Sequence, residues 1–195
     1  VGAGSGWDVR GQIMSPGGVA VGEEFLVNSY TSATQYAPSV AALKDGGFIV
    51  SWNDYSGHGD GSAYDIRGQK FDSKGATVGE EFLVNQSMDS GYQYTPSVVG
   101  LKDGGYVVSW RDDEGSNHDA GDGAGAGSGI DVWARVFNTD GSEAASEFRV
   151  NTSVTKSGSQ YEPTVTDLSN GGFAIAWRDN SGSSHDAGDG AGAGS

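Results

Sequence analysis

Gly46-Gly-Phe-Ile-Val-Ser-Trp52 occurs in three versions along this chain and gives the strongest indication of its fold. It returns as Gly104-Gly-Tyr-Val-Val-Ser-Trp110 and as Gly171-Gly-Phe-Ala-Ile-Ala-Trp177. The Asp-Gly or Asn-Gly step at the start of each version is typical of a tight hairpin turn, and the β-branched and aromatic residues after it predict a strand. A repeated unit of this kind buries its apolar face against neighbouring copies, so the sequence predicts an array of β-units.

Other motifs recur in the same order and define three repeats. Each repeat contains Phe-x-Val-Asn followed by Gln-Tyr-x-Pro, and each ends in a loop made largely of Gly and Asp. We place the repeats at residues 1–63, 64–129 and 130–195. None is long enough to bury a large core by itself, so neighbouring repeats must supply one.

Each repeat has four segments with the alternation or composition of short strands, and almost no segment favours helix. In the first repeat they are residues 7–14, 24–28, 38–43 and 48–52. Four antiparallel strands form one blade of a β-propeller. We therefore predict an all-β protein of three tandem four-stranded antiparallel units, either propeller-blade-like or in an open repeat array. Because a propeller needs four or more blades, the units must continue in a longer chain, pair with another copy or remain open.

The two ends of the sequence copy one internal loop. Residues 2–6 repeat residues 125–129, and residues 185–195 repeat residues 118–128. We interpret the chain as a window from a longer array or as a unit that joins identical units, the alternative being a chain trimmed at convenient loops. The expected partners are therefore copies of itself or neighbouring repeats.

The acidic composition excludes several classes of function. The 195 residues include 26 Asp and Glu against 11 Lys and Arg, for a formal net charge of -15. Binding to nucleic acid or to an anionic membrane surface needs a basic footprint, so we expect neither partner. No stretch approaches 18 apolar residues, so we also expect no membrane insertion. With no cysteine in the sequence, disulfides and thiolate metal sites are excluded. This fits a bacterial extracellular protein stabilised by divalent ions, and equally fits a cytosolic protein.

The Gly/Asp loops have the composition of calcium sites. Calcium takes six to eight oxygen ligands, and glycine lets the backbone turn tightly enough to present carboxylates and carbonyls together. We therefore predict Ca2+ as a cofactor that holds each loop closed. The predicted metal ligands are Asp8, Asp54, Asp60, Asp65, Asp112, Asp113, Asp119, Asp122, Asp131, Asp179, Asp186 and Asp189.

Two simpler interpretations of these loops stay open. The aspartates can cap and turn solvated connectors without binding any ion. His58, His118 and His185 invite a zinc interpretation, but each loop has one histidine and no cysteine, too few for a closed tetrahedral site. The spacing of an EF-hand, with its glutamate at loop position twelve, is absent.

The order Asp-Val or Asp-Ile, Phe-x-Val-Asn, Pro-x-Val, Gly-Gly-Phe and Trp-x-Asp resembles the tandem repeats of large bacterial secreted proteins of the RTX group. The resemblance implies a calcium-rich, adhesin-like protein at the cell surface or outside the cell, exported by type I secretion. Gly125-Ala-Gly-Ser-Gly-Ile-Asp131 is similar to one turn of the RTX nonapeptide. That similarity implies a calcium role for Asp131, and for Asp8 and Asp65 as its positional equivalents. The consecutive turns that would stack into a β-roll are missing.

Catalysis is not expected, because the same carboxylates occur in all three repeats whereas an active site differs from its copies. We also find no Gly-x-Ser-x-Gly elbow and no phosphate-binding Gly-Lys-Ser/Thr. The predicted function is a calcium-stabilised extracellular structural and adhesive module that self-associates into a filament or stalk. The alternative is a calcium-dependent, lectin-like module that binds surface glycans by aromatic stacking. That alternative requires Tyr55, Tyr92 and Tyr94 to be exposed.

Overall fold

The computed structural model describes residues 6–58, 64–86, 91–113, 130–151 and 159–180. These residues form twelve strands. Among them, no helix is long and apolar enough to cross a membrane. The strands are β1 (Arg10–Met14), β2 (Ala20–Leu26), β3 (Gln35–Ala42), β4 (Phe48–Asp54), β5 (Asp65–Phe71), β6 (Thr77–Leu83), β7 (Tyr92–Gly100), β8 (Tyr106–Asp113), β9 (Asp131–Phe137), β10 (Glu143–Arg149), β11 (Gln160–Asp167) and β12 (Phe173–Asp179).

The strands form four antiparallel sheets of two, four, four and two strands. Their orders are β1-β2, β3-β4-β5-β6, β7-β8-β9-β10 and β11-β12. The all-β, antiparallel prediction is confirmed. The expected grouping into three four-stranded units is not, because each complete sheet joins the last two strands of one repeat to the first two of the next.

The reason for this grouping is the ladder between β4 and β5. It runs without interruption from the pair Phe48 and Phe71 to the pair Asp54 and Asp65. The corresponding ladder of β8 and β9 runs from Tyr106 and Phe137 to Asp112 and Asp131. The Gly/Asp loops that we expected between units therefore connect hydrogen-bonded neighbours inside one sheet.

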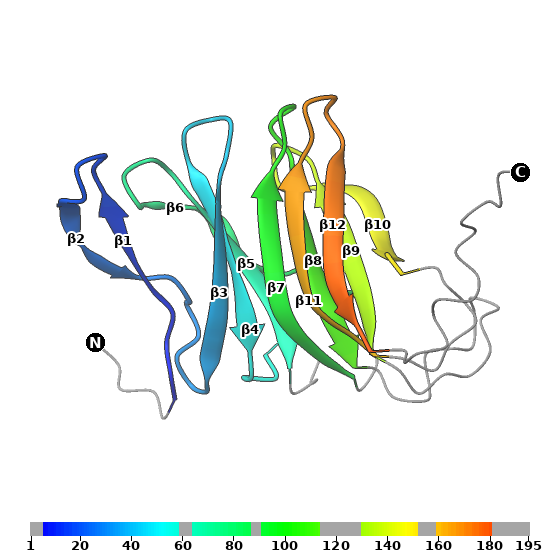
Figure 1. Cartoon of the computed structure of the whole chain (residues 1–195). Helices are drawn as coiled ribbons and strands as arrows, with labels where there is room; N and C mark the ends of the chain where they lie inside the picture. Colours follow the sequence, from blue (N-terminus) through cyan, green and yellow to red (C-terminus); the bar gives the residue numbers. More distant parts are fainter. Residues whose placement is uncertain (1–5, 59–63, 87–90, 114–129, 152–158, 181–195) are drawn as a thin grey trace, which may run out of the picture.

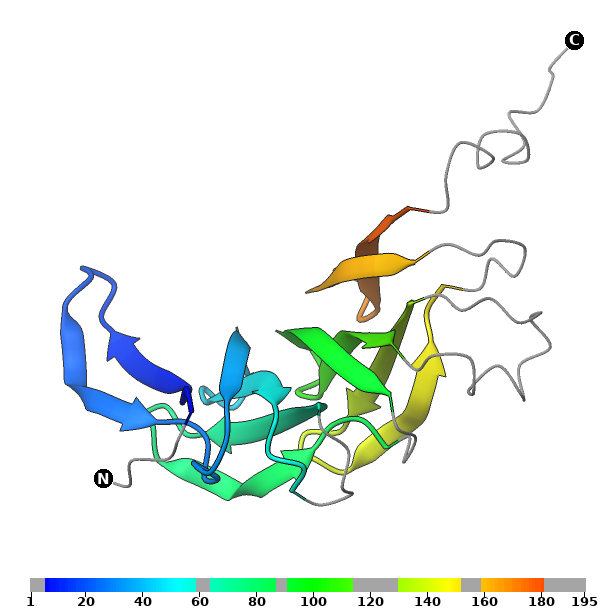
Figure 2. The ribbon, with the colours of Figure 1, turned by 90° about the horizontal axis from the view of Figure 1, so that it is seen from below.

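The four sheets follow one another along an open arc, seen end-on in Figure 2. Strands β3, β7 and β11 lie side by side along the inner side of the arc, and β6 and β10 lie on its outer side (Figures 1 and 2). The half-sheets β1-β2 and β11-β12 occupy its two ends. None of the sheets closes on itself.

The same turn occurs in each hairpin whose turn contains Gly-Gly. At the β3–β4 turn, Gly46 has a φ of 88°, in the left-handed region where glycine has no Cβ penalty. Its N–H donates to the carbonyl of Leu43 (3.1 Å), and the carboxylate of Asp45 accepts from the Gly47 N–H (2.9 Å). This explains why Asp-Gly or Asn-Gly is found at the start of the recurring segment.

The core lies between successive sheets. The side chains of Tyr106, Val108 and Trp110 extend from β8 into a cluster with Ile49 of β4 and Ile66 of β5. All five are fully buried. The alternate residue Val107 belongs to a second cluster, which faces β11 and β12. The central strands β4 and β8 therefore each contribute to two cores, which explains why each begins with a continuous apolar run, Phe48–Val50 and Tyr106–Val108.

Candidate functional site

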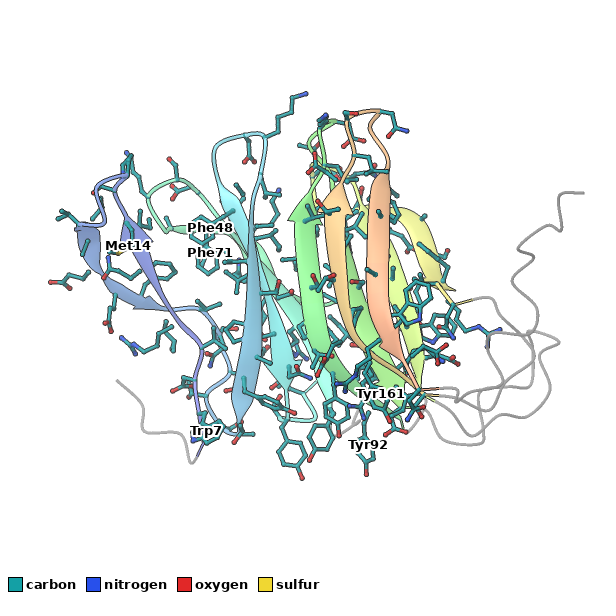
Figure 3. All side chains as sticks on the ribbon, viewed as in Figure 1. Trp7, Met14, Phe48, Phe71, Tyr92 and Tyr161 are labelled. Atoms are coloured by element: carbon teal, nitrogen blue, oxygen red, sulfur yellow. The ribbon has the colours of Figure 1, made fainter. Side chains whose placement is uncertain are left out.

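Aromatic side chains gather at one end of the sheets, where β4 ends and β5 and β7 begin. Figure 3 shows Trp7, Tyr92 and Tyr161 along this same lower end. The tyrosine cluster, defined here as Tyr55, Tyr64, Tyr92 and Tyr94, occupies the part between the two complete sheets. Tyr55 directly follows β4, Tyr64 precedes β5, and the other two belong to β7.

The rings of the tyrosine cluster are in direct contact. Tyr55 stacks on Tyr64 with 4.3 Å between ring centroids, and Tyr92 meets Tyr64 edge-on at 4.8 Å. Tyr94 lies 5.2 Å from Tyr64. Tyr55 is 45% exposed and Tyr92 is 44% exposed, while Tyr94 is half-buried. The exposure that a glycan-stacking surface requires is therefore present at Tyr55 and Tyr92.

Two tyrosines of the cluster, Tyr94 and Tyr64, have raised pKa values. Burial, followed by the neighbouring Tyr64, Tyr36 and Asp113, raises the pKa of Tyr94 to about 12, and the charge of Arg111 opposes this rise. Burial and then a hydrogen bond with Tyr55 raise the pKa of Tyr64. The phenols of Tyr64 and Tyr94 are thus neutral hydrogen-bond donors and acceptors at neutral pH.

Arginines extend the aromatic surface along the sheet ends. The guanidinium of Arg111 lies 5.1 Å from the ring centre of Tyr94 and 5.0 Å from that of Tyr161. At the other side, Arg67 lies 5.4 Å from the ring centre of Tyr30, on which His58 stacks at 3.6 Å. These cation–π contacts fix the rings and place hydrogen-bond donors among them.

Directly inside this surface lies an Asp-Asn-Gln-Asp network. In its first copy, Asn28 Nδ2 donates to Asp8 Oδ1 (2.9 Å) and to Gln35 Oε1 (3.3 Å). Gln35 Nε2 donates to Asp54 Oδ1 (2.9 Å), and Asn28 Oδ1 accepts from the Val9 N–H (2.8 Å). The network ties the start of one strand to the end of another.

The network occurs once in each repeat. Its second copy joins Asp65, Asn85, Gln93 and Asp112. Its third copy joins Asp131, Asn151, Gln160 and Asp179. In both, the asparagine carbonyl again accepts a backbone N–H, from Ile66 and from Val132. The recurrence of Phe-x-Val-Asn and Gln-Tyr-x-Pro in the sequence follows from this shared hydrogen bonding.

Six of the predicted calcium ligands belong to this network. They are Asp8, Asp54, Asp65, Asp112, Asp131 and Asp179. Asp54 is the most completely engaged, because its Oδ2 also accepts from Ser56 Oγ (2.6 Å) and from Arg67 Nε (2.7 Å). At least one carboxylate oxygen of each of these aspartates therefore accepts a hydrogen bond from a protein donor.

The other six predicted calcium ligands do not belong to the network. Asp113 pairs with Arg111 at 3.6 Å. Asp60, Asp119, Asp122, Asp186 and Asp189 lie outside the described residues, as do His118 and His185. Within the described ranges, no group of three or more Asp, Glu or His side chains is placed to hold one metal ion. The prediction of calcium ligands at all twelve aspartates stays a prediction, and five of the twelve lie outside the described residues.

Several residues of this region were not singled out by sequence analysis. Tyr64, Arg67 and Arg111 carry contacts of the aromatic surface, and Asn85 and Gln93 carry the network. The recurrence of Asn and Gln was visible in the sequence, and its spacing from Asp is the signal that indicates a network. The position of Arg67 is occupied by Arg10 in the first repeat and by Trp133 in the third, so the arginine recurs in only two of the three repeats.

Comparison with known proteins gives a likeness of fold. No known protein family and no curated protein matches the sequence. Among solved structures, the chain is similar to an endo-arabinase from Bacteroides thetaiotaomicron VPI-5482, with a TM-score of 0.50 and 14% sequence identity. The match covers 84% of this chain and 57% of that enzyme chain. At this identity, the likeness concerns the arrangement of strands alone.

Proposed function

We propose that this protein is a non-catalytic structural and adhesive module of the cell exterior that binds carbohydrate through the tyrosine cluster. The observation that carries the proposal is the contiguous set of tyrosine rings at one sheet end, with Tyr55 and Tyr92 nearly half exposed. Tyrosine offers an apolar face for the C–H surface of a sugar and a hydroxyl for its polar edge. Neighbouring Arg111 and Asp113 supply a donor and acceptors for sugar hydroxyls.

The absence of catalysis is part of the proposal. The network carboxylates accept hydrogen bonds from asparagine and glutamine amides in all three repeats, which supports a structural role for them. The similar enzyme is an endo-arabinase, so arabinan is the first polysaccharide to test. Binding without release of reducing ends is the expected result.

Calcium remains the proposed stabilising ion of the Gly/Asp loops. The support is the charge of -15 together with the clustering of aspartate in those loops. An ion bound to the native state alone raises its stability by mass action. A calcium-specific rise in melting temperature, absent with magnesium or EGTA, is the expected result, and no rise would leave the loops as solvated connectors.

The carbohydrate proposal is tested by calorimetric titration of arabino-oligosaccharides, with xylo- and cello-oligosaccharides as further ligands. Tyr92→Ala and Tyr55→Ala are expected to weaken binding at least tenfold, whereas Tyr92→Phe keeps the stacking face and most of the affinity. Val78→Ala, at an exposed position of β6, is the matched control. Wild-type protein that binds none of these sugars, or Tyr→Ala variants that bind as well as wild type, would contradict the proposal.

A further inference from the structure

We propose that the half-sheets β1-β2 and β11-β12 are two parts of one four-stranded sheet, which forms when β12 of one copy pairs with β1 of a second copy. The inference concerns sheet edges and does not depend on carbohydrate binding. It makes the partner specific: a second copy of this chain, joined through a defined strand register.

The repeats themselves provide the template for this pairing. Strand β12 is the equivalent of β4 and β8, and β1 is the equivalent of β5 and β9. In the two complete sheets, these equivalents are neighbours in an unbroken antiparallel ladder. The same register would place Phe173 opposite Met14, Trp177 opposite Arg10 and Asp179 opposite Asp8 of the second copy.

The edge at β12 shows the exposure expected of an interrupted sheet. Trp177 is 38% exposed, whereas its equivalents Trp52 and Trp110 are completely buried. Leu168 is 39% exposed, while its equivalents Leu43 and Leu101 are each 7% exposed. Identical residue types at equivalent repeat positions are thus more exposed here, where no strand of the described residues pairs with the outer edge of β12 and no further sheet covers it.

The other end of the array, at β1, also has exposed apolar side chains where a strand and a sheet would pack. Val40 of β3 is 66% exposed, although its equivalent Val98 is 6% exposed against the preceding sheet. A cavity of about 540 Å³ lies beside it, and its apolar lining side chains include Val9, which precedes β1, and Phe48 and Val50 of β4. Met14, at the end of β1 in Figure 3, is exposed where its equivalents Phe71 and Phe137 are buried.

The second copy carries side chains that suit this cavity. In the complete pair of sheets, Ile49 of β4 belongs to the cluster of Tyr106 and Val108. Ala174 occupies the position of Ile49, and Phe48 and Val50 occupy those of Tyr106 and Val108. The docked β12 would therefore place Ala174 against the cavity wall formed by Phe48 and Val50.

Polar contacts between sheets follow the same equivalence. The hydroxyl of Ser39 accepts from the Val98 N–H (3.1 Å), and that of Ser97 accepts from the Val165 N–H (3.2 Å). Thr164 supplies a hydroxyl at the next equivalent position. Across the junction, this hydroxyl would accept from the Val40 N–H of the second copy. Both residues of this contact, Thr164 and Val40, are present in the chain.

Two such junctions close a ring. Each copy contributes two complete sheets and two halves. Two copies therefore contain the strands of about six four-stranded sheets, within the range of four to eight found in closed propellers. The open arc of Figure 2 has its two half-sheets at its ends, where a second copy would meet both. Closure removes the exposed strand edges that otherwise favour aggregation.

Disulfide trapping tests the register and the closure together, because the chain contains no cysteine of its own. Ala174 and Ile13 would be directly opposed across the junction, as Ile49 and Lys70 are in the complete sheet. Directly opposed positions have the Cα separation that a disulfide requires. The double variant Ala174→Cys/Ile13→Cys is expected to give a covalent dimer on oxidation, and Ala174→Cys/Val21→Cys, with its second cysteine on β2, is the control that should not cross-link.

Sedimentation of the unmodified protein gives an independent readout. A concentration-dependent dimer is expected, and Gly172→Ala should weaken it at least tenfold without lowering the melting temperature of the monomer. A monomer at all concentrations, or equal cross-linking of both double variants, would overturn the proposal. A ladder of covalent oligomers in place of a dimer would overturn the closed ring.

Discussion

The complete sheet β7-β10 and the half-sheet β11-β12 contain nearly the same recurring segment in different surroundings. In the complete sheet, Trp110 lies between a following strand and a preceding sheet and is fully buried. In the half-sheet, Trp177 has the preceding sheet, but among the described residues no strand pairs with β12 on its other side. The repeat sequence therefore specifies a strand and its faces, while the depth of its burial depends on which neighbours are present.

The largest difference is expected between tryptophan truncations. Trp110→Ala removes a fully buried ring and should lower the free energy of unfolding by about 3–5 kcal/mol. Trp177→Ala should cost less than half as much, because that ring is already partly solvated. Urea unfolding of dilute protein measures both values. Equal losses would mean that β12 is as well covered in solution as β8.

Gly105 of the complete sheet and Gly172 of the half-sheet occupy equivalent positions. Replacing each by alanine compares the two sheets by adding a methyl group and not by removing a side chain. A Cβ at Gly105 would lie 2.4 Å from the carbonyl oxygen of Phe137 in β9, so Gly105→Ala forces the strands apart at a cost of about 1–3 kcal/mol. At Gly172 a Cβ would meet no backbone atom within 4 Å, so Gly172→Ala should leave the monomer unchanged. Thermal melts of the two variants side by side would show the difference, and a strongly destabilised Gly172→Ala monomer would refute it.

The polar network should weaken from the interior towards the end of the array. Asn85 is fully buried and Asn151 is half-buried. Asn85→Ala leaves Asp65, Gln93 and the Ile66 N–H short of a partner, which should cost about 1–3 kcal/mol. Asn151→Ala should cost less because water reaches the vacated groups. Urea unfolding of the two variants measures the losses, and a larger loss for Asn151→Ala than for Asn85→Ala would reverse the expected order.

The smallest effect is expected at alkaline pH in the tyrosine cluster between the two complete sheets. The pKa of Tyr94 is raised to about 12 from an ordinary value of 10.0, so the unfolded chain loses this proton first. The contribution of the protonated Tyr94 to the free energy of unfolding is fully present below pH 10 and is lost as the pH rises towards 12. Absorbance titration of tyrosinate, with Tyr94→Phe as the reference, measures it. A transition of Tyr94 near pH 10 in the folded protein would contradict the assignment.

The strands and turns were predictable from the sequence because they depend on local signals. The Asp-Gly step before Gly46 and the β-rich segment after it specify a hairpin wherever they occur. The grouping into sheets was not predictable in this way. In a periodic sequence, local patterns do not show which four consecutive strands form one sheet. The ladder that pairs Phe48–Asp54 with β5 shows that the sheet continues across the Gly/Asp loop.

The candidate site was predictable in part for a similar reason. Tyr55, Tyr92 and Tyr94 were identified from aromatic residues beside acidic loops; the first two are exposed, whereas Tyr94 is half-buried. The role of Asp54 was harder to predict, because a recurring aspartate at a strand end has the same sequence pattern whether it binds an ion or accepts hydrogen bonds. Its partner Gln35 lies at the far end of another strand, which local reasoning does not bring together.

The hairpins β4–β5 and β8–β9 also bear on how this sequence can vary. They close on equivalent pairs, Asp54 with Asp65 and Asp112 with Asp131, although the segments between these residues differ in length. Strand pairing in these hairpins is thus independent of the number of residues in the connection. Peptides grafted into that connection would be displayed beside the tyrosine cluster without a change of register, which makes the hairpin a ready scaffold for selecting new binding specificities.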